Sequence, residues 1–292
     1  MKHIVMFNKF HGSFCLAAAL LGACIAGPLH AAPAATAISA ATPLVIGESF
    51  NIESKVLAET RHINVYMSRG YGLPADAPLP VLYMPDGGLR EDFLHIAGLL
   101  QVSVDNGTMR PFMLVGIENT QRRRDMTGPT DNAEDKKIAP VVGGSAQFRR
   151  FIKEELMPEV KQRYRTTGET ALVGESLAGL FVVETFLREP QLFDHYVAAD
   201  PSLWWNDSKL LAEAPQLLDK RSTKPQTLYF ASSSNAGIVK GAEQLSALLT
   251  TRAPAGLQWH YQQMPAETHA TIYQPAALQA FRMMLKPKPA AN

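Results

Sequence analysis

The chain has 292 residues, of which 46% are hydrophobic and 19% charged, and its formal net charge at pH 7 is +1. This length suits one large α/β domain or two small ones. The composition excludes a disordered chain, and the near-zero charge argues against nucleic acid as a partner.

The first 31 residues predict an export signal. Lys2 and Lys9 give a basic start, residues 14–27 form an apolar run, and Ala31 supplies a small residue at a cleavage site. The run is too short for a comfortable membrane span, so no transmembrane segment is expected, and a retained anchor or buried helix is the alternative. We therefore expect a periplasmic or secreted protein.

A second processing route is open at the same end of the chain. Residues 21–24 read Leu-Gly-Ala-Cys and resemble a lipobox, which would place a lipid anchor on Cys24. Cleavage of the signal after residue 31 instead removes both Cys15 and Cys24. The mature protein then has no disulfide and no cysteine metal site, which an oxidising periplasm permits.

From residue 48 onward, strand and helix patterns alternate. Strands at residues 50–56 and 62–67, joined by a short turn, predict an antiparallel hairpin. The remaining strands are expected at residues 81–84, 112–117, 171–173, 196–199, 227–231 and 258–262, and the helices at 93–102, 148–164, 180–187, 210–218, 242–249 and 276–285. This order predicts a mostly parallel sheet covered by helices on both faces.

One domain at residues 48–287 accounts for this alternation. A disordered leader rich in Ala, Pro and Thr precedes it at residues 32–47, and a tail follows at residues 288–292. Residues 120–144 form a polar loop longer than most connections, which indicates a functional role. Ligands of such sheets collect at the carboxyl ends of the strands.

The most informative motif is Gly-Glu-Ser-Leu-Ala-Gly at residues 174–179, between an apolar strand and an apolar helix. This layout is typical of a nucleophile elbow, which raises a serine above the sheet. Strand and helix nearly touch there, so small residues are needed on both sides of the serine, and Gly174 and Ala178 meet that need. Ser176 is the expected nucleophile, and a chance Gly-x-Ser in an ordinary turn is the alternative.

A serine nucleophile needs a base. In hydrolases with such an elbow, the histidine follows the last strand of the sheet. His269 stands in the loop after the strand at residues 258–262, from which a side chain can reach Ser176. An ordinary surface histidine is the alternative interpretation.

The sequence leaves open which residue is the acid that would orient this histidine. The loop at residues 232–238, where the acid usually lies, contains no carboxylate. Asp200, which follows the neighbouring strand, is the preferred candidate, and a turn-capping role is its alternative. Glu243 and Glu267 are the other candidates, and a Ser–His pair oriented by a backbone carbonyl or by Asn235 is a further option.

The tetrahedral intermediate of ester cleavage needs N–H donors for its oxyanion. One donor is expected from the backbone of Leu177, directly after the nucleophile. The other is expected from Gly87 or Gly88, because a glycine lets the backbone approach the substrate closely. Chemistry of this kind requires no metal and no organic cofactor.

Four motifs stand in one order along the chain. They are Val-Leu-Tyr-Met-Pro-Asp-Gly at residues 81–87, Gly-Ile-Glu-Asn-Thr at 116–120 followed by Arg-Arg-Arg-Asp at 122–125, the elbow, and Pro-Ser-Leu-Trp-Trp at 201–205. Together they resemble the Putative esterase (esterase D-like) family of α/β-hydrolases, and especially its exported bacterial branch that includes siderophore esterases. The resemblance spans about residues 50–285 and implies an α/β-hydrolase fold.

The chain departs from this family pattern at two places. Relatives usually carry a carboxylate where this chain has Asn235-Ala236, which leaves the acid open. They commonly carry a histidine where this chain has Glu175, a change expected to alter only the local field.

The resemblance also implies that the loop bearing Arg122, Arg123 and Arg124 borders the active site. Arginines beside an ester-cleaving serine would suit ferric catecholate trilactones, which are polyanionic, and a solvated charge run is the alternative. Trp204 and Trp205 are expected to wall an acyl or aryl pocket, or one of them to belong to the core.

These features predict an exported serine carboxylic-ester hydrolase that acts on a small-molecule ester, with siderophore trilactones such as enterobactin as the preferred substrate class. A broad esterase or acyltransferase acting on acyl or carbohydrate esters is the first alternative. A non-catalytic binding protein on a hydrolase scaffold is the second, and the missing acid is its support.

Overall fold

The computed structural model describes residues 40–70, 72–219 and 224–287. The chain divides into two units, residues 1–44 and Val45–Asn292, and the second holds every helix and strand of the described residues. The expected signal peptide, both cysteines and the C-terminal tail lie outside these ranges. Within them, no helix has the length and apolar character needed to cross a membrane.

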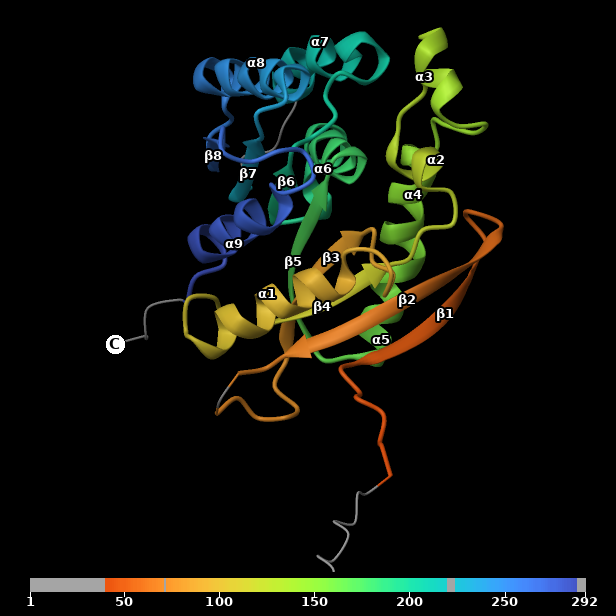
Figure 1. Cartoon of the computed structure of the whole chain (residues 1–292), viewed down its shortest axis with the longest axis vertical. Helices are drawn as coiled ribbons and strands as arrows, with labels where there is room; N and C mark the ends of the chain where they lie inside the picture. The colour runs from red at the N-terminus through yellow and green to blue at the C-terminus, as the bar shows by residue number, and fades with distance from the viewer. Residues whose placement is uncertain (1–39, 71, 220–223, 288–292) are drawn as a thin grey trace, which may run out of the picture. The chain divides into compact units, whose positions relative to one another are not determined.

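In the described part of the chain, eight strands form one sheet, in the order β1-β2-β4-β3-β5-β6-β7-β8 (Figure 1). The strands are β1 (Glu48–Ser54), β2 (Glu59–Ser68), β3 (Leu79–Pro85), β4 (Phe112–Ile117), β5 (Thr166–Glu175), β6 (His195–Ala199), β7 (Gln226–Ser232) and β8 (Leu257–Gln263). Strands β1 and β2 form the predicted antiparallel hairpin, and β2 is also antiparallel to β4. All other pairs are parallel, which confirms the predicted sheet.

Helices follow most of the strands. They are α1 (Phe93–Asp105), α2 (Arg122–Met126), α3 (Ala133–Ile138), α4 (Ser145–Phe151), the π-helical turn η1 (Ile152–Leu156), α5 (Met157–Arg163), α6 (Leu177–Arg188), the short 3₁₀ turn η2 (Pro190–Leu192), α7 (Trp205–Asp219), α8 (Ala236–Arg252) and α9 (Tyr273–Met284). The single helix predicted at residues 148–164 is therefore a continuous run of α4, η1 and α5.

The loop predicted at residues 120–144 contains two short helices, α2 and α3. The α3 helix begins after Asn132, whose side chain accepts a hydrogen bond from the backbone N–H of Glu134. Such a cap satisfies one of the N–H groups that a helix start leaves without a partner. The prediction of a polar loop did not include these two helices, because short helices of polar residues show little apolar periodicity.

The inner strands β3 and β4 are buried on both faces, whereas the edge strands β1 and β8 are partly exposed. Along β3, Leu82 and Met84 belong to the core beneath α1 and α9, whereas Val81 and Tyr83 belong to the core beneath α4, α5, α6 and α8. This alternation follows from the two-residue period of a strand. Strands covered on both faces read as continuous apolar runs, as β3 does. Helices α1 and α9 pack side by side in Figure 1.

Candidate active site

Ser176 occupies the turn between β5 and α6. Its backbone has φ 61° and ψ −118°, a conformation that costs energy for a residue with a side chain. A Cβ atom added to Gly174 would lie 2.7 Å from the carbonyl carbon and oxygen of Ala178 and 2.8 Å from its Cβ. Strand and helix therefore touch at the predicted positions, and Gly174 allows the contact that holds Ser176 in this conformation.

His269 lies in the loop between β8 and α9, next to the elbow. Its Nε2 is 3.0 Å from Oγ of Ser176, and its Nδ1 is 2.6 Å from Oδ2 of Asp200. Asp200 follows β6 and is fully buried. The three side chains thus form one hydrogen-bonded chain from hydroxyl through imidazole to carboxylate.

The Asp200 carboxylate is held from behind by Ser233. The backbone N–H of Ser233 donates to Oδ1 at 2.6 Å, and the Ser233 hydroxyl donates to Oδ2 at 2.8 Å. The hydrogen bond from Nδ1 to Asp200 raises the pKa of His269, as do the charges of Glu175 and Asp200, although partial burial opposes this effect. A basic, oriented imidazole is what a proton-abstracting group requires.

The other acid candidates lie elsewhere. Glu243 is exposed on α8, and in the described part of the chain neither Glu243 nor Glu267 makes a hydrogen bond to His269. The side chain of Asn235 accepts hydrogen bonds from the N–H groups of Gly237 and Ile238 and so caps α8. Its amide oxygen is therefore committed to that helix rather than to the imidazole.

Glu175 reaches the imidazole as well, which the sequence analysis missed. Its Oε1 lies 3.4 Å from Nδ1 of His269, and burial raises the pKa of Glu175 to about 7. A signal for this contact was present, because Glu175 directly precedes the nucleophile in the strained elbow.

The three expected oxyanion donors differ in availability. Leu177 is the first residue of α6, where helical N–H groups have no partner within the helix. The N–H of Gly87 donates to the carbonyl of Ile117 at 2.9 Å, so Gly87 is not free to act as a donor. The N–H of Gly88 donates to Oε2 of Glu91 at 2.7 Å and becomes free only if Glu91 moves.

A cavity of about 350 Å³ opens in front of Ser176. Trp204 and Trp205 line it with their rings tilted and 6.1 Å apart between centroids. Trp205 is buried, and its indole N–H donates to the carbonyl of Gly128, whereas Trp204 is partly exposed. The other lining residues are Arg122, Arg123, Ile138, Leu177, Ser202, Asn235, Ile238 and His269.

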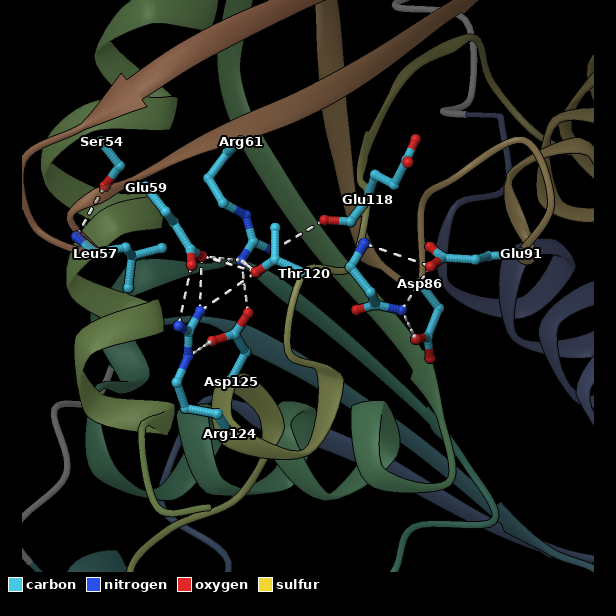
Figure 2. Close-up of polar contacts among 11 residues, drawn as sticks. Ser54, Leu57, Glu59, Arg61, Asp86, Glu91, Glu118, Thr120, Arg124 and Asp125 are labelled. Atoms are coloured by element: carbon cyan, nitrogen blue, oxygen red, sulfur yellow. Dashed lines mark hydrogen bonds and ion pairs between the residues drawn. The ribbon is translucent and has the colours of Figure 1, made fainter. Parts of the chain in front are cut away.

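The three consecutive arginines do not share one role. Arg122 and Arg123 line the cavity, but Arg124 does not. The Arg124 guanidinium instead points to Glu59 and Asp125, as Figure 2 shows. Residues 122–126 form a helix, in which neighbouring side chains point about 100° apart, and Arg124 is turned away from the cavity that Ser176 lines. The expectation for Arg124 is corrected accordingly.

Glu175, Asp200 and His269 bring their ligand-type atoms within 4.8 Å of one another, a distance at which a metal could be held. Both ring nitrogens of His269 are already engaged, one by Ser176 and one by Asp200. The arrangement therefore suits proton transfer better than ion binding.

Comparisons with known proteins identify the family. The model of the family described as Putative esterase matches residues 54–266. The ferri-bacillibactin esterase BesA of Bacillus subtilis is 25% identical over 256 residues, covering 78% of this chain and 86% of the relative. The siderophore enterobactin esterase of Emericella nidulans is 37% identical over 111 residues, covering 35% of this chain and 37% of the relative.

Solved structures show the same fold. An IroE-like serine hydrolase from Shewanella oneidensis superimposes with a TM-score of 0.73 at 29% identity, covering 82% of this chain and 80% of the other. The enterobactin esterase from Shigella flexneri has a TM-score of 0.64 at 17% identity, covering 83% of this chain and 59% of the other, a likeness of fold alone. The chain belongs to the Putative esterase family of the α/β-hydrolase superfamily and is an esterase.

Proposed function

We propose that the chain is a serine esterase in which Ser176 is the nucleophile, His269 the base and Asp200 the acid. The hydrogen-bonded chain of these three side chains carries the proposal. Nε2 of His269 takes the proton of the Ser176 hydroxyl as Oγ attacks the ester carbonyl, and then returns it to the leaving alcohol. Water, activated by the same imidazole, hydrolyses the acyl-enzyme and restores the hydroxyl.

The developing oxyanion would be stabilised by backbone donors. The N–H of Leu177 is the first, because it follows the nucleophile at the start of α6. Gly88 supplies the second once Glu91 has released its N–H. Asp200 fixes the tautomer in which Nδ1 carries the proton and stabilises the imidazolium that forms during attack.

The proposed substrates are siderophore esters of the enterobactin-like trilactone class. Relatives named as siderophore esterases support this class. Arg123 adds a cation to the cavity, and no carboxylate pairs with it in the described part of the chain. Trp204 and Trp205 offer faces against which an aromatic ring can pack.

A broad acyl or carbohydrate esterase, or an acyltransferase, is the second candidate function. The observation in its favour is that Asp86 already binds Arg122 through two hydrogen bonds. That pairing neutralises one of the two cations of the cavity, which weakens the case for a highly charged substrate.

The first experiment combines covalent labelling with a substrate panel. A fluorophosphonate probe should label the wild-type chain and leave Ser176→Ala unlabelled. Rates on apo enterobactin, ferric enterobactin and p-nitrophenyl acyl esters then separate the two candidate functions. Failure to label the folded wild-type protein would contradict the proposed nucleophile.

We further propose export, with a signal at residues 1–31, a leader at residues 32–47, the catalytic domain at residues 48–287 and a tail at residues 288–292. The basic start and apolar run of the first residues support it. The mass of the mature protein recovered from the periplasm distinguishes cleavage after Ala31 from lipid attachment at Cys24.

A further inference from the structure

Two carboxylates approach the same ring nitrogen of His269. Oδ2 of Asp200 is 2.6 Å from Nδ1, and Oε1 of Glu175 is 3.4 Å from it. The two acids come from different strands, because Glu175 ends β5 and Asp200 follows β6. A single Nδ1–H proton can form one short hydrogen bond at a time, and Asp200 holds it here.

The Glu175 oxygen that lies nearer to His269 has no hydrogen-bond partner among the described residues. This oxygen, Oε1, is buried. Burying such an acceptor without a donor costs free energy, so a fold with no need for this carboxylate would gain by replacing it. Asp200, in contrast, is bonded twice by Ser233 and cannot turn away from the imidazole.

We propose that Glu175 is a positioning residue for His269, a reserve acceptor for the Nδ1–H that also adds a second negative charge beside the imidazole. The inference rests on the proposed Ser176–His269–Asp200 mechanism and deepens it. Glu175 acts through His269 and touches neither the ester nor the nucleophilic oxygen.

The charge of Glu175 depends on its surroundings. Burial and the nearby charges of Asp200 and Asp92 favour its neutral form, whereas His269 and Arg122 favour its ionised form. The ionisable groups that influence it therefore come from several elements, and Tyr273 of α9 also senses its charge. The charges of Glu175 and His269 therefore each favour the ionised form of the other group.

Two consequences can be measured. In Asp200→Asn, the carboxylate of Glu175 can accept the hydrogen bond from Nδ1–H of His269 instead, so part of the activity should survive. In Glu175→Gln, His269 loses an anionic neighbour. The pKa of His269 therefore falls, and the acid limb of kcat/KM moves to lower pH. Neither effect is expected of a glutamate that only fills space.

The test is a double-mutant cycle with Glu175→Gln and Asp200→Asn, read as kcat and KM for p-nitrophenyl acetate. Loss of the acid in a serine protease lowers kcat about 10⁴-fold. With Glu175 in reserve, Asp200→Asn alone should lose only about 10²-fold, and the double variant should lose about 10⁴-fold. Glu175→Gln alone should lower kcat by a few-fold, leave KM unchanged and shift the acid limb down.

Glu243→Gln is the matched control, because it removes an exposed carboxylate of α8, and Glu243 is not among the described residues that form a hydrogen bond or ion pair with His269. Glu243→Gln should change kcat by the same factor in the wild type and in Asp200→Asn. The role of Glu175 would be overturned if Glu175→Gln lowered kcat by the same factor in the wild type and in Asp200→Asn, or if it left the acid limb unmoved. Labelling of the wild type by the fluorophosphonate probe would in that case still support the mechanism. Absence of that labelling would overturn both proposals.

Discussion

Arg122 grips the carboxylate of Asp86 with two parallel hydrogen bonds, from Nε to Oδ1 at 2.6 Å and from Nη2 to Oδ2 at 2.8 Å. Asp86 follows β3 and Arg122 begins α2, so the pair ties the loop with the expected oxyanion donor to the helix that borders the cavity. Asn119 also donates to Asp86 at 2.6 Å and to Glu91, which Figure 2 shows beside Asp86. Arg122 therefore joins the two segments through Asp86. Arg123 donates one hydrogen bond to the carbonyl of Ile138 and forms no ion pair with any described residue, so its charge is available to a ligand.

The first prediction concerns recognition of charge by Arg123. Arg123→Ala should raise KM for ferric enterobactin about 5-fold, as expected for an exposed ion pair. Its effect should shrink in high salt, because the screening length falls from about 10 Å at 0.1 M to about 3 Å at 1 M. KM for neutral p-nitrophenyl acetate should not change.

Arg124→Ala is the matched control, since this arginine is bound to Glu59 and Asp125 and does not line the cavity. It should lower the melting temperature and leave both KM values unaltered. If Arg123→Ala raised KM equally for charged and neutral esters, α2 would shape the cavity without recognising charge. The siderophore proposal would then lose its support from this residue.

The second prediction concerns the nucleophile and the base. Ser176→Ala and His269→Ala should each lower kcat by roughly 10³-fold or more, because each removes one end of the proton transfer at 3.0 Å. Circular dichroism should show an intact fold in both. Either variant turning over p-nitrophenyl acetate near the wild-type rate would rule out this mechanism.

Much of the fold was predictable because its inner strands, such as β3 and β4, are buried on both faces. The apolar run at residues 112–117 coincides with β4, which is buried throughout. The hairpin was placed less well, and β1 begins two residues earlier than expected, because its residues alternate between exposed and partly buried. Patterns set by burial are visible in a sequence, whereas the ends of edge strands depend on pairing.

Site residues whose positions follow from the order of elements along the chain were predictable. Residues whose roles depend on the direction of their side chains were not. Ser176 and His269 follow from the order of strand, turn and helix. The sequence favoured Asp200 over Glu243 without settling the choice, because the approach of Asp200 to His269 depends on a backbone with φ 46°. The place of Glu175 directly before the nucleophile is visible in the sequence, whereas its 3.4 Å approach to His269 depends on the strained geometry of the elbow.

The third prediction concerns the close contact at the elbow. Gly174→Ala places a Cβ 2.7 Å from the backbone of Ala178, so strand and helix must separate and Ser176 must shift. A displacement near 1 Å is enough to lower kcat about 10²-fold. Gly98→Ala is the control, because an added Cβ there meets nothing within 4 Å and should stabilise α1. Equal activity of the two variants would contradict the steric argument.

The last prediction concerns pH. The hydrogen bond to Asp200, with the charges of Glu175 and Asp200, raises the pKa of His269 above its usual 6.5. The imidazole must be neutral to accept the Ser176 proton, so activity is full above this pKa and is lost as the pH falls through it. The acid limb of kcat/KM should therefore lie above pH 6.5 in the wild type.

Asp200→Asn checks the cause of this shift. It removes the strongest stabiliser of the imidazolium, so the pKa of His269 should fall and the acid limb should move to lower pH. NMR titration of the His269 ring gives the same pKa without relying on the reduced activity of the variant. A wild-type limb below pH 6.5, or an upward shift in Asp200→Asn, would mean that burial rather than the carboxylate governs this histidine.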